Sequence, residues 1–139
     1  MEQSICRSIT LPNDVQAVPQ LTEFVEGVCE TMDFDMGTTL KLNLAIEEAV
    51  VNVMNYAYPT GTEGFVDIEV QSDGVWLTFV ICDNGMPFDP TAAKDVDTTL
   101  PVEKRSIGGL GIFLVRQIMD SIRYERVGEK NILTLRKKL

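Results

Sequence analysis

Three polar side chains in one expected helix have the types and the spacing to handle a cation and a proton. Glu48, Asn52 and Asn55 stand four and then three residues apart within residues 40–59, so they lie within about a turn of each other. An amide oxygen can bind a hard cation such as Mg²⁺, and a carboxylate can accept a proton. A polar face opposite a core stripe is the ordinary alternative, but two asparagines in mid-helix, where they are poor helix formers, favour a site.

A second candidate follows the apolar run of residues 75–82. Asp83 comes directly after this run, where a carboxylate is costly unless it meets a donor. Gly85 permits close approach to the backbone, and Pro87 stiffens the chain after it. An Asx-turn with a loop would explain the same residues without a ligand, so both interpretations stay open here.

A third candidate is the glycine-rich start of another expected helix, at Gly108, Gly109 and Gly111. Free backbone amides and the positive end of the helix dipole make such a start an anion site, although glycines also permit tight packing. The spacing fits neither the P-loop nor the dinucleotide-binding fingerprint. Together with the carboxylate and amide pair, this start would let an acidic protein bind a nucleoside triphosphate with Mg²⁺.

Length and composition limit the remaining classes. The 139 residues predict one domain over 1–139, and 45% hydrophobic with 24% charged residues is typical of a globular chain. A net charge of −9 disfavours nucleic acid as a main partner. The absence of histidine excludes imidazole catalysis, imidazole metal ligands and a phosphohistidine on this chain. Residues 123–139 carry six basic and two acidic residues, which predicts a solvated basic edge.

The cysteines and the N-terminus predict a cytoplasmic protein without membrane contact. Cys6, Cys29 and Cys82 form neither a CxxC pair nor a zinc quartet. They lie among apolar neighbours, so we expect buried, reduced thiols. The N-terminal residues show no basic stretch followed by an apolar one, and the apolar runs are shorter than a membrane helix.

Hydrophobic periodicity and turn residues predict the order strand, helix, helix, strand, strand, irregular stretch, helix, strand, strand. The expected ranges are 3–11, 19–32, 38–58, 65–71, 75–82, 84–107, 108–119, 121–127 and 131–138. The strands can form one mixed, mostly antiparallel sheet with the helices on one face, which is a two-layer α/β (α+β) sandwich. The irregular stretch is longer than an ordinary loop and is expected to be a functional lid.

The long helix and the strand after it position the candidate site. Thr38 or Thr39 is expected to cap the helix, and Pro59 to end it. Its core stripe comprises Leu42, Ile46, Val50, Val53 and Ala57. The strand over 75–82 reads as buried on both faces because it is almost continuously apolar.

This ordered set of segments resembles the GHKL ATPase superfamily, which has the Bergerat fold. The N box is similar in Glu48–Asn52, the first glycine box in Asp83–Asp89 and the second in Gly108–Gly111. The combination spans about residues 38–137. The small size and the close GGLGIFLV run look most like the anti-sigma regulatory factor, or serine-protein kinase, branch.

The resemblance implies a role for each motif residue. Asn52 would coordinate Mg²⁺, Glu48 would act as general base, and Asp83 would accept a hydrogen bond from the adenine amino group. The implied nucleotide-contacting set is Asn52, Asn55, Asp83, Gly85, Pro87, Lys104, Arg105, Gly108, Gly109, Leu110, Gly111 and Asn131. One departure is Tyr56, because many relatives carry a histidine or basic residue there, facing the phosphates.

The resemblance further implies an ATP-dependent, Mg²⁺-dependent protein serine/threonine kinase. The protein would phosphorylate a small antagonist domain on a serine and sequester a sigma factor or similar regulator. The resemblance also implies that it forms a homodimer. One alternative is a nucleotide-dependent binding module with little or no phosphotransfer. Another is the detached catalytic half of a histidine kinase, which would need a partner chain with the phosphoacceptor.

Overall fold

A computed structural model describes residues 4–58, 63–92 and 109–139 of the chain. Its strands are β1 (Ser4–Pro12), β2 (Phe65–Asp73), β3 (Trp76–Asp83), β4 (Ser121–Val127) and β5 (Lys130–Lys138). Its α-helices are α1 (Val18–Thr31), α2 (Met36–Tyr56) and α3 (Gly109–Ile118), and the short 3-10 helices are η1 (Val15–Ala17) and η2 (Pro90–Ala92). The predicted order of elements is confirmed, and η2 lies in the stretch expected to be irregular.

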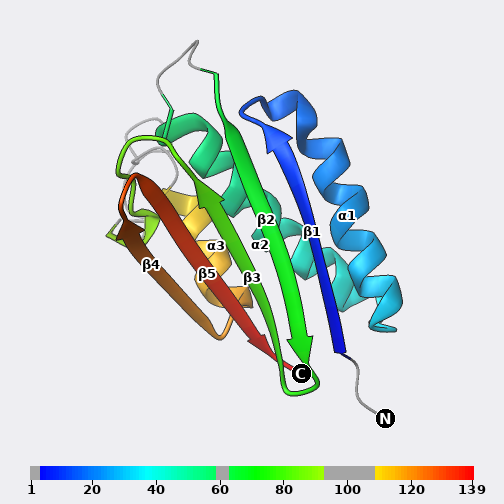
Figure 1. Cartoon of the computed structure of the whole chain (residues 1–139). Helices are drawn as coiled ribbons and strands as arrows, with labels where there is room; N and C mark the ends of the chain where they lie inside the picture. Colours follow the sequence, from blue (N-terminus) through cyan, green and yellow to red (C-terminus); the bar gives the residue numbers. More distant parts are fainter. Residues whose placement is uncertain (1–3, 59–62, 93–108) are drawn as a thin grey trace.

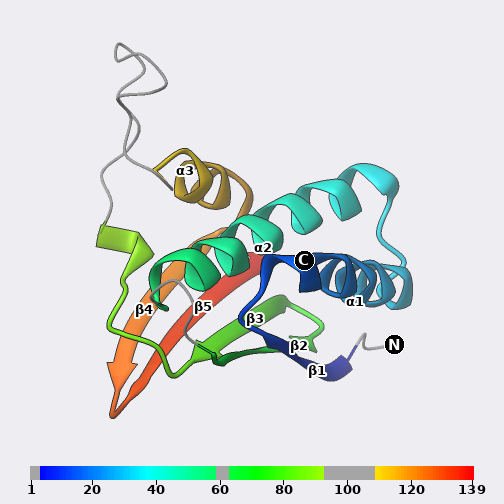
Figure 2. The ribbon, with the colours of Figure 1, turned by 90° about the horizontal axis from the view of Figure 1, so that it is seen from above.

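The described strands form one sheet in the order β1-β2-β3-β5-β4, which puts β3 at its centre (Figure 1). All four strand pairs are antiparallel, so the described sheet is antiparallel throughout rather than mixed. The three α-helices lie on one side of this sheet (Figure 2). The predicted two-layer sandwich is therefore confirmed.

Burial alternates along β3, and this corrects one prediction. Leu77, Phe79 and Ile81 are fully buried under the helices, whereas the residues between them are only partly buried. The strand was expected to be buried on both faces. That expectation was wrong because no helix covers the second face within the described residues. Apolar side chains on that face, such as Val80, are therefore only partly buried.

Helix α2 has the predicted core stripe, and every member of that stripe is buried. Its cap differs from the prediction. Asp35, not Thr38 or Thr39, is the N-cap, and its Oδ1 accepts a 2.7 Å hydrogen bond from the Thr38 amide. Aspartate is a strong N-cap residue, so the helix begins at Met36, before both threonines. No helix in the described part of the chain is long and apolar enough to cross a membrane.

The three cysteines are free, as expected, but only one is buried. Cys29 lies in the core, whereas Cys6 is exposed and Cys82 is partly buried. Cys6 and Cys82 occupy the strand positions that alternate with the buried ones, on the sheet face without helices. Apolar neighbours in sequence did not reveal this because adjacent residues of a strand point to opposite faces.

The strand register brings three polar residues into one row at the end of the sheet. Asp83 on β3 pairs with Asn131 on β5, and Asn131 pairs with Arg126 on β4. Asp83 and Asn131 are buried, with exposed fractions of 4% and 3%. Because they follow the alternation of Ile81 and Leu133, they lie on the helix side of the sheet.

Asp35→Ala tests the cap of the helix that carries the candidate residues. The hydrogen bonds from Thr38 lower the pKa of Asp35 from its ordinary value of 3.8. A carboxylate with a depressed pKa stabilises the fold above its unfolded pKa, and this contribution is lost as the pH falls through the folded pKa. We expect a lower urea midpoint for the variant at pH 7, and a smaller difference from wild type below pH 3.8. Glu30→Ala, at the end of α1, is the control. An equal loss at all pH values would contradict the capping role.

Candidate functional site

Asp83, the last residue of β3, is a buried carboxylate with one oxygen bonded and one left over. Its Oδ1 accepts hydrogen bonds from the Gly85 amide at 2.8 Å and from Asn131 Nδ2 at 2.9 Å. Its Oδ2 is buried without a hydrogen-bond partner among the described residues. A buried polar atom without a partner is unfavourable, so this oxygen is suited to a donor that arrives with a ligand. The Asx-turn through Gly85 is also present, so the two interpretations of this segment are compatible.

Helix α2 carries the second group of candidate residues, and these differ in how far they are buried. Asn52 is buried, with 6% of its surface exposed, and Glu48 one turn earlier is half-buried. Neither side chain hydrogen-bonds to another described residue, which leaves the Glu48 carboxylate and the Asn52 amide free for a ligand. Asn55 is exposed. The structure therefore groups Glu48 with Asn52 and leaves Asn55 further out.

The loop after β3 packs against the C-terminal end of α2. The Met86 amide donates to the Ala57 carbonyl at 2.7 Å, and the rings of Tyr56 and Phe88 lie 5.5 Å apart. A Cβ on Gly85 would lie only 2.3 Å from the Ala57 carbonyl oxygen. Glycine is thus required here for contact with the helix backbone, a reason independent of any ligand. These contacts hold the loop after β3 beside the C-terminal end of α2.

Asn131 on β5 is bonded at both ends of its side-chain amide. Its Nδ2 donates to Asp83 Oδ1 and, at 2.7 Å, to the Met86 carbonyl. Its Oδ1 accepts from the Phe88 amide at 3.2 Å and from the Tyr124 hydroxyl at 2.5 Å. The amide has two hydrogens and an oxygen with two lone pairs, so all are in use. Asn131, predicted as a nucleotide contact, binds the residues around it through these four bonds.

The chain after this loop is attached to α3. Asp89 Oδ1 accepts from the Thr91 amide at 2.8 Å, and Arg116 on α3 donates to the Thr91 carbonyl at 2.7 Å. The predicted helix over 108–119 is confirmed as α3, which begins at Gly109. Of the residues predicted to contact phosphates, Lys104, Arg105 and Gly108 lie outside the described residues. Pro87 is exposed on the loop.

Four side chains that hold the site together were not predicted. Tyr58 hydrogen-bonds to the Phe65 carbonyl and to Asn84, and burial raises the pKa of its phenol, which keeps it protonated as a donor. Arg126 donates to the Gly85 carbonyl at 2.8 Å. Tyr124 and Arg116 make the contacts given above. The alternation along the short strand β4 could have indicated from sequence that Tyr124 and Arg126 share one face. It could not have indicated which groups they bind.

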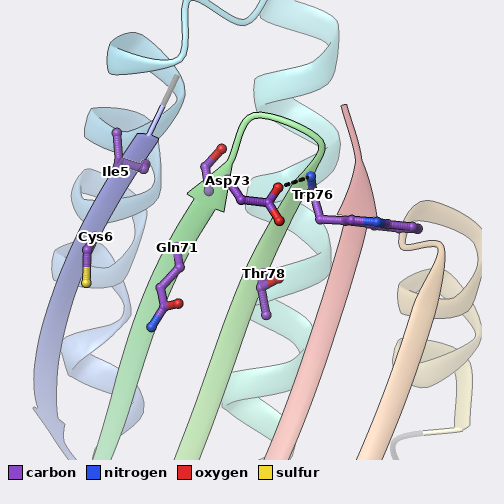
Figure 3. A pocket seen from close by; sticks show the side chains of 7 residues that line it. Ile5, Cys6, Gln71, Asp73, Trp76 and Thr78 are labelled. Atoms are coloured by element: carbon purple, nitrogen blue, oxygen red, sulfur yellow. Dashed lines mark hydrogen bonds between the residues drawn. The ribbon is translucent and has the colours of Figure 1, made fainter. Parts of the chain in front are cut away.

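A hollow lies at the end of the sheet opposite Asp83, beside the β2–β3 turn (Figure 3). Its volume is about 270 Å³, and its lining includes Cys6, Gln71, Asp73 and Trp76. Asp73 is committed to the turn, where it accepts from the Val75 and Trp76 amides. The Arg136 guanidinium lies 4.4 Å from the Trp76 ring. Arg136 and Arg126 thus have partners, and the basic end of the chain is not simply a solvated edge.

The chemistry available at the first site follows from its donors and acceptors. Asp83 offers one buried acceptor, Asn52 an amide, Glu48 a free carboxylate, and α3 the amides of its first turn. No cluster of three or more metal-ligating side chains occurs among the described residues. A metal here would need most of its ligands from elsewhere, which is typical of Mg²⁺ bound together with phosphates.

A model of the histidine kinase-like ATPase domain matches residues 11–137. The chain belongs to this family. The match covers all three candidate segments, so the predicted superfamily is confirmed, and with it ATP as the nucleotide.

Proteins similar to this chain include kinases. The serine-protein kinase RsbW of Oceanobacillus iheyensis is 30% identical over 117 residues, which cover 76% of this chain and 74% of that protein. The serine/threonine-protein kinase BtrW of Bordetella bronchiseptica is 29% identical, with 68% and 66% covered. A solved structure of the RsbU and RsbW domains of Rv1364c from Mycobacterium tuberculosis has a TM-score of 0.69 at 15% identity. It covers 97% of this chain but 32% of that one, and it supports the fold alone.

Gly85→Ala tests the packing of the Asp83 segment on α2. The added Cβ would meet a backbone oxygen that cannot rotate away, so we expect a loss of about 1–3 kcal/mol in the free energy of unfolding. Urea denaturation monitored by circular dichroism measures it. Gly37→Ala, where the nearest atom is 3.8 Å away, is the control and should be neutral or slightly stabilising. Unchanged stability of Gly85→Ala would contradict the close contact.

Proposed function

We propose that this protein is an ATP-dependent protein serine kinase. Its substrate is a small antagonist protein that carries the target serine, and it sequesters a transcription regulator such as a sigma factor. The observation that carries the proposal is the buried Asp83 Oδ2 without a partner. The loop that follows Asp83 packs against the end of α2, the helix that carries Glu48 and Asn52. The similarity to serine-protein kinases that cover most of the chain supports the same activity.

Adenine fits the Asp83 end of the site. The exocyclic amino group of adenine is a donor, and Oδ2 is an acceptor that the described protein leaves unbonded. The Gly85 amide and Asn131 hold the other carboxylate oxygen, so the side chain need not rotate to bind. A buried acceptor that only the correct ligand satisfies discriminates strongly among ligands.

Phosphates and Mg²⁺ fit the region between α2 and the start of α3. The first-turn amides of α3 can bind phosphate oxygens. The Asn52 amide oxygen would supply the protein ligand to Mg²⁺, which would neutralise charge on the phosphates. Lys104 and Arg105 are proposed to contribute positive charge there. Tyr56 packs against Phe88 and supplies no charge, so more of the phosphate binding would depend on backbone amides.

Glu48 is the proposed general base. A base must be within hydrogen-bond reach of the proton it accepts and must not already be paired. Glu48 is half-buried and has no hydrogen-bond partner among the described residues. In the proposed transfer, the serine oxygen bonds to the γ-phosphorus as the bond to the β–γ bridging oxygen breaks, and the serine proton moves to Glu48.

The partners follow from the same activity. Phosphorylation of the antagonist would change its affinity for the kinase, and nucleotide state would decide which partner is bound. The proposal includes a homodimer and a cytoplasmic location, where ATP and transcription regulators are available. A module that only binds in response to nucleotide would need Asn52 and Asp83 but no unpaired carboxylate, so Glu48 favours the kinase.

Glu48→Gln separates catalysis from binding. The amide keeps the size of the side chain but cannot accept the proton, so phosphotransfer should fall by about 10²–10⁴-fold with ATP affinity unchanged. Labelled ATP with the antagonist as substrate measures transfer, and calorimetry measures binding. Glu47→Gln, the adjacent carboxylate, is the control and should retain activity. A wild-type protein that binds ATP without transferring phosphate would favour the binding module.

Asn52→Ala tests the metal ligand. Loss of the amide oxygen should weaken ATP binding by about 10–100-fold in the presence of Mg²⁺ and much less in EDTA. Asn43→Ala, on the same helix away from the site, is the control. Equal weakening with and without Mg²⁺ would show that Asn52 binds something other than the metal.

A further inference from the structure

Asn131 is a buried residue whose side chain is fully hydrogen-bonded to Asp83 and to the residues around it. Its side chain makes four hydrogen bonds, to Asp83 Oδ1, the Met86 carbonyl, the Phe88 amide and the Tyr124 hydroxyl. It is 3% exposed and is the direct cross-strand partner of Asp83. A side chain bonded on every side cannot turn, so its Nδ2 always presents a donor to Asp83.

This fixed donor determines which Asp83 oxygen remains for a ligand. Asn131 Nδ2 and the Gly85 amide both donate to Oδ1, at 2.9 and 2.8 Å. Two donors at one position favour an acceptor there, so a side chain with one acceptor and one donor would turn its acceptor toward them. The other position, Oδ2, has no partner among the described residues. The carboxylate therefore presents a single acceptor in a single direction.

The same amide also sets the loop that follows. Asn131 bonds the backbone of Met86 and Phe88, and Arg126 from the neighbouring strand bonds the Gly85 carbonyl. The β4–β5 hairpin thus orients both the carboxylate and the backbone of three residues in the loop beside it. A change at residue 131 would alter the direction of Asp83 and not merely the stability of the sheet.

We propose that Asn131 is a positioning residue that fixes the direction in which Asp83 presents its free oxygen to a 6-amino purine. The inference rests on the proposed nucleotide site. A 6-amino group donates to Oδ2, whereas the 6-oxo group of hypoxanthine would set an acceptor against an acceptor. Inosine diphosphate (IDP) therefore differs from ADP at the atom that Oδ2 reads, and wild type should prefer ADP by at least about 100-fold.

The decisive variant is Asp83→Asn, which keeps the shape of the side chain. With Asn131 in place, two donors hold the new carbonyl oxygen at the Oδ1 position, so the NH₂ group takes the Oδ2 position and becomes a donor. The preference should then reverse, with IDP bound more tightly than ADP. In Asp83→Asn combined with Asn131→Ala, one of the two donors is gone, the amide can turn, and the two affinities should lie within about threefold of each other.

Calorimetric titration with ADP and IDP in Mg²⁺ buffer measures these ratios, and circular dichroism melting monitors folding of each variant. Glu129→Gln, at an exposed position in the β4–β5 turn, is the control and should keep the wild-type preference. Reversal in Asp83→Asn that is lost on Asn131→Ala supports the positioning role. If Asp83→Asn still binds ADP more tightly than IDP, the positioning role is overturned, even if the double variant does not fold.

The proposed function and the role of Asn131 are contradicted by different results. A folded wild-type protein that binds neither ADP nor ATP would overturn the proposed function and this inference together. A wild-type protein that binds ADP and IDP equally would overturn the inference and leave ATP-dependent function in place.

Discussion

The buried hydrogen bond between Asp83 and Asn131 is the interaction on which the rest of the site depends. A carboxylate at the end of a central strand, 4% exposed, is tolerated only if donors replace the water it loses. Asn131 and the Gly85 amide provide two donors to the same oxygen. This satisfies half of the carboxylate and leaves the other half for the proposed recognition of a nucleotide, so the structural role and the proposed functional role share one side chain.

Helix α2 imposes a second constraint, because it must serve the core and the site at once. Its core stripe is buried against the sheet, while Glu48 and Asn52 lie to the side, at the margin between the core and solvent. Asn52 is more deeply buried than Glu48 and yet has no described hydrogen-bond partner. The helix end is held by Tyr58 and by the contact between Ala57 and the Met86 amide, so the positions of these two side chains are coupled to the loop after β3.

An acidic chain without histidine can still bind a polyanion, since the proposed phosphate contacts depend on helix amides and a metal rather than on net charge. Two of its arginines stabilise the backbone near the site. Arg126 and Arg116 bind the carbonyls of Gly85 and Thr91, so both ends of the loop are tied to the C-terminal half of the chain. Positive charge near the nucleotide region thus also orders the backbone that surrounds it.

Local sequence was sufficient for the elements and for the family. Periodicity predicted every described α-helix and strand to within a few residues, because the apolar stripe of α2 and the alternation of β2 are local properties. Glu48, Asn52 and Asp83 could be selected since a carboxylate or amide at those positions has a local cost. Asp35 was missed as the cap because two threonines offered equally good local chemistry.

Tertiary structure alone decided what each candidate contacts. Register placed Asp83 opposite Asn131, which is 48 residues away in the chain, and alternation put Cys6 and Cys82 on the sheet face without helices. The fold leaves Asn55 exposed, and it engages the Asn131 amide in hydrogen bonds within the protein. The sequence by itself determined the types of the site residues and the elements that carry them. Their pairing required the fold, because hydrogen bonds between distant strands depend on register and on which face of the sheet is covered.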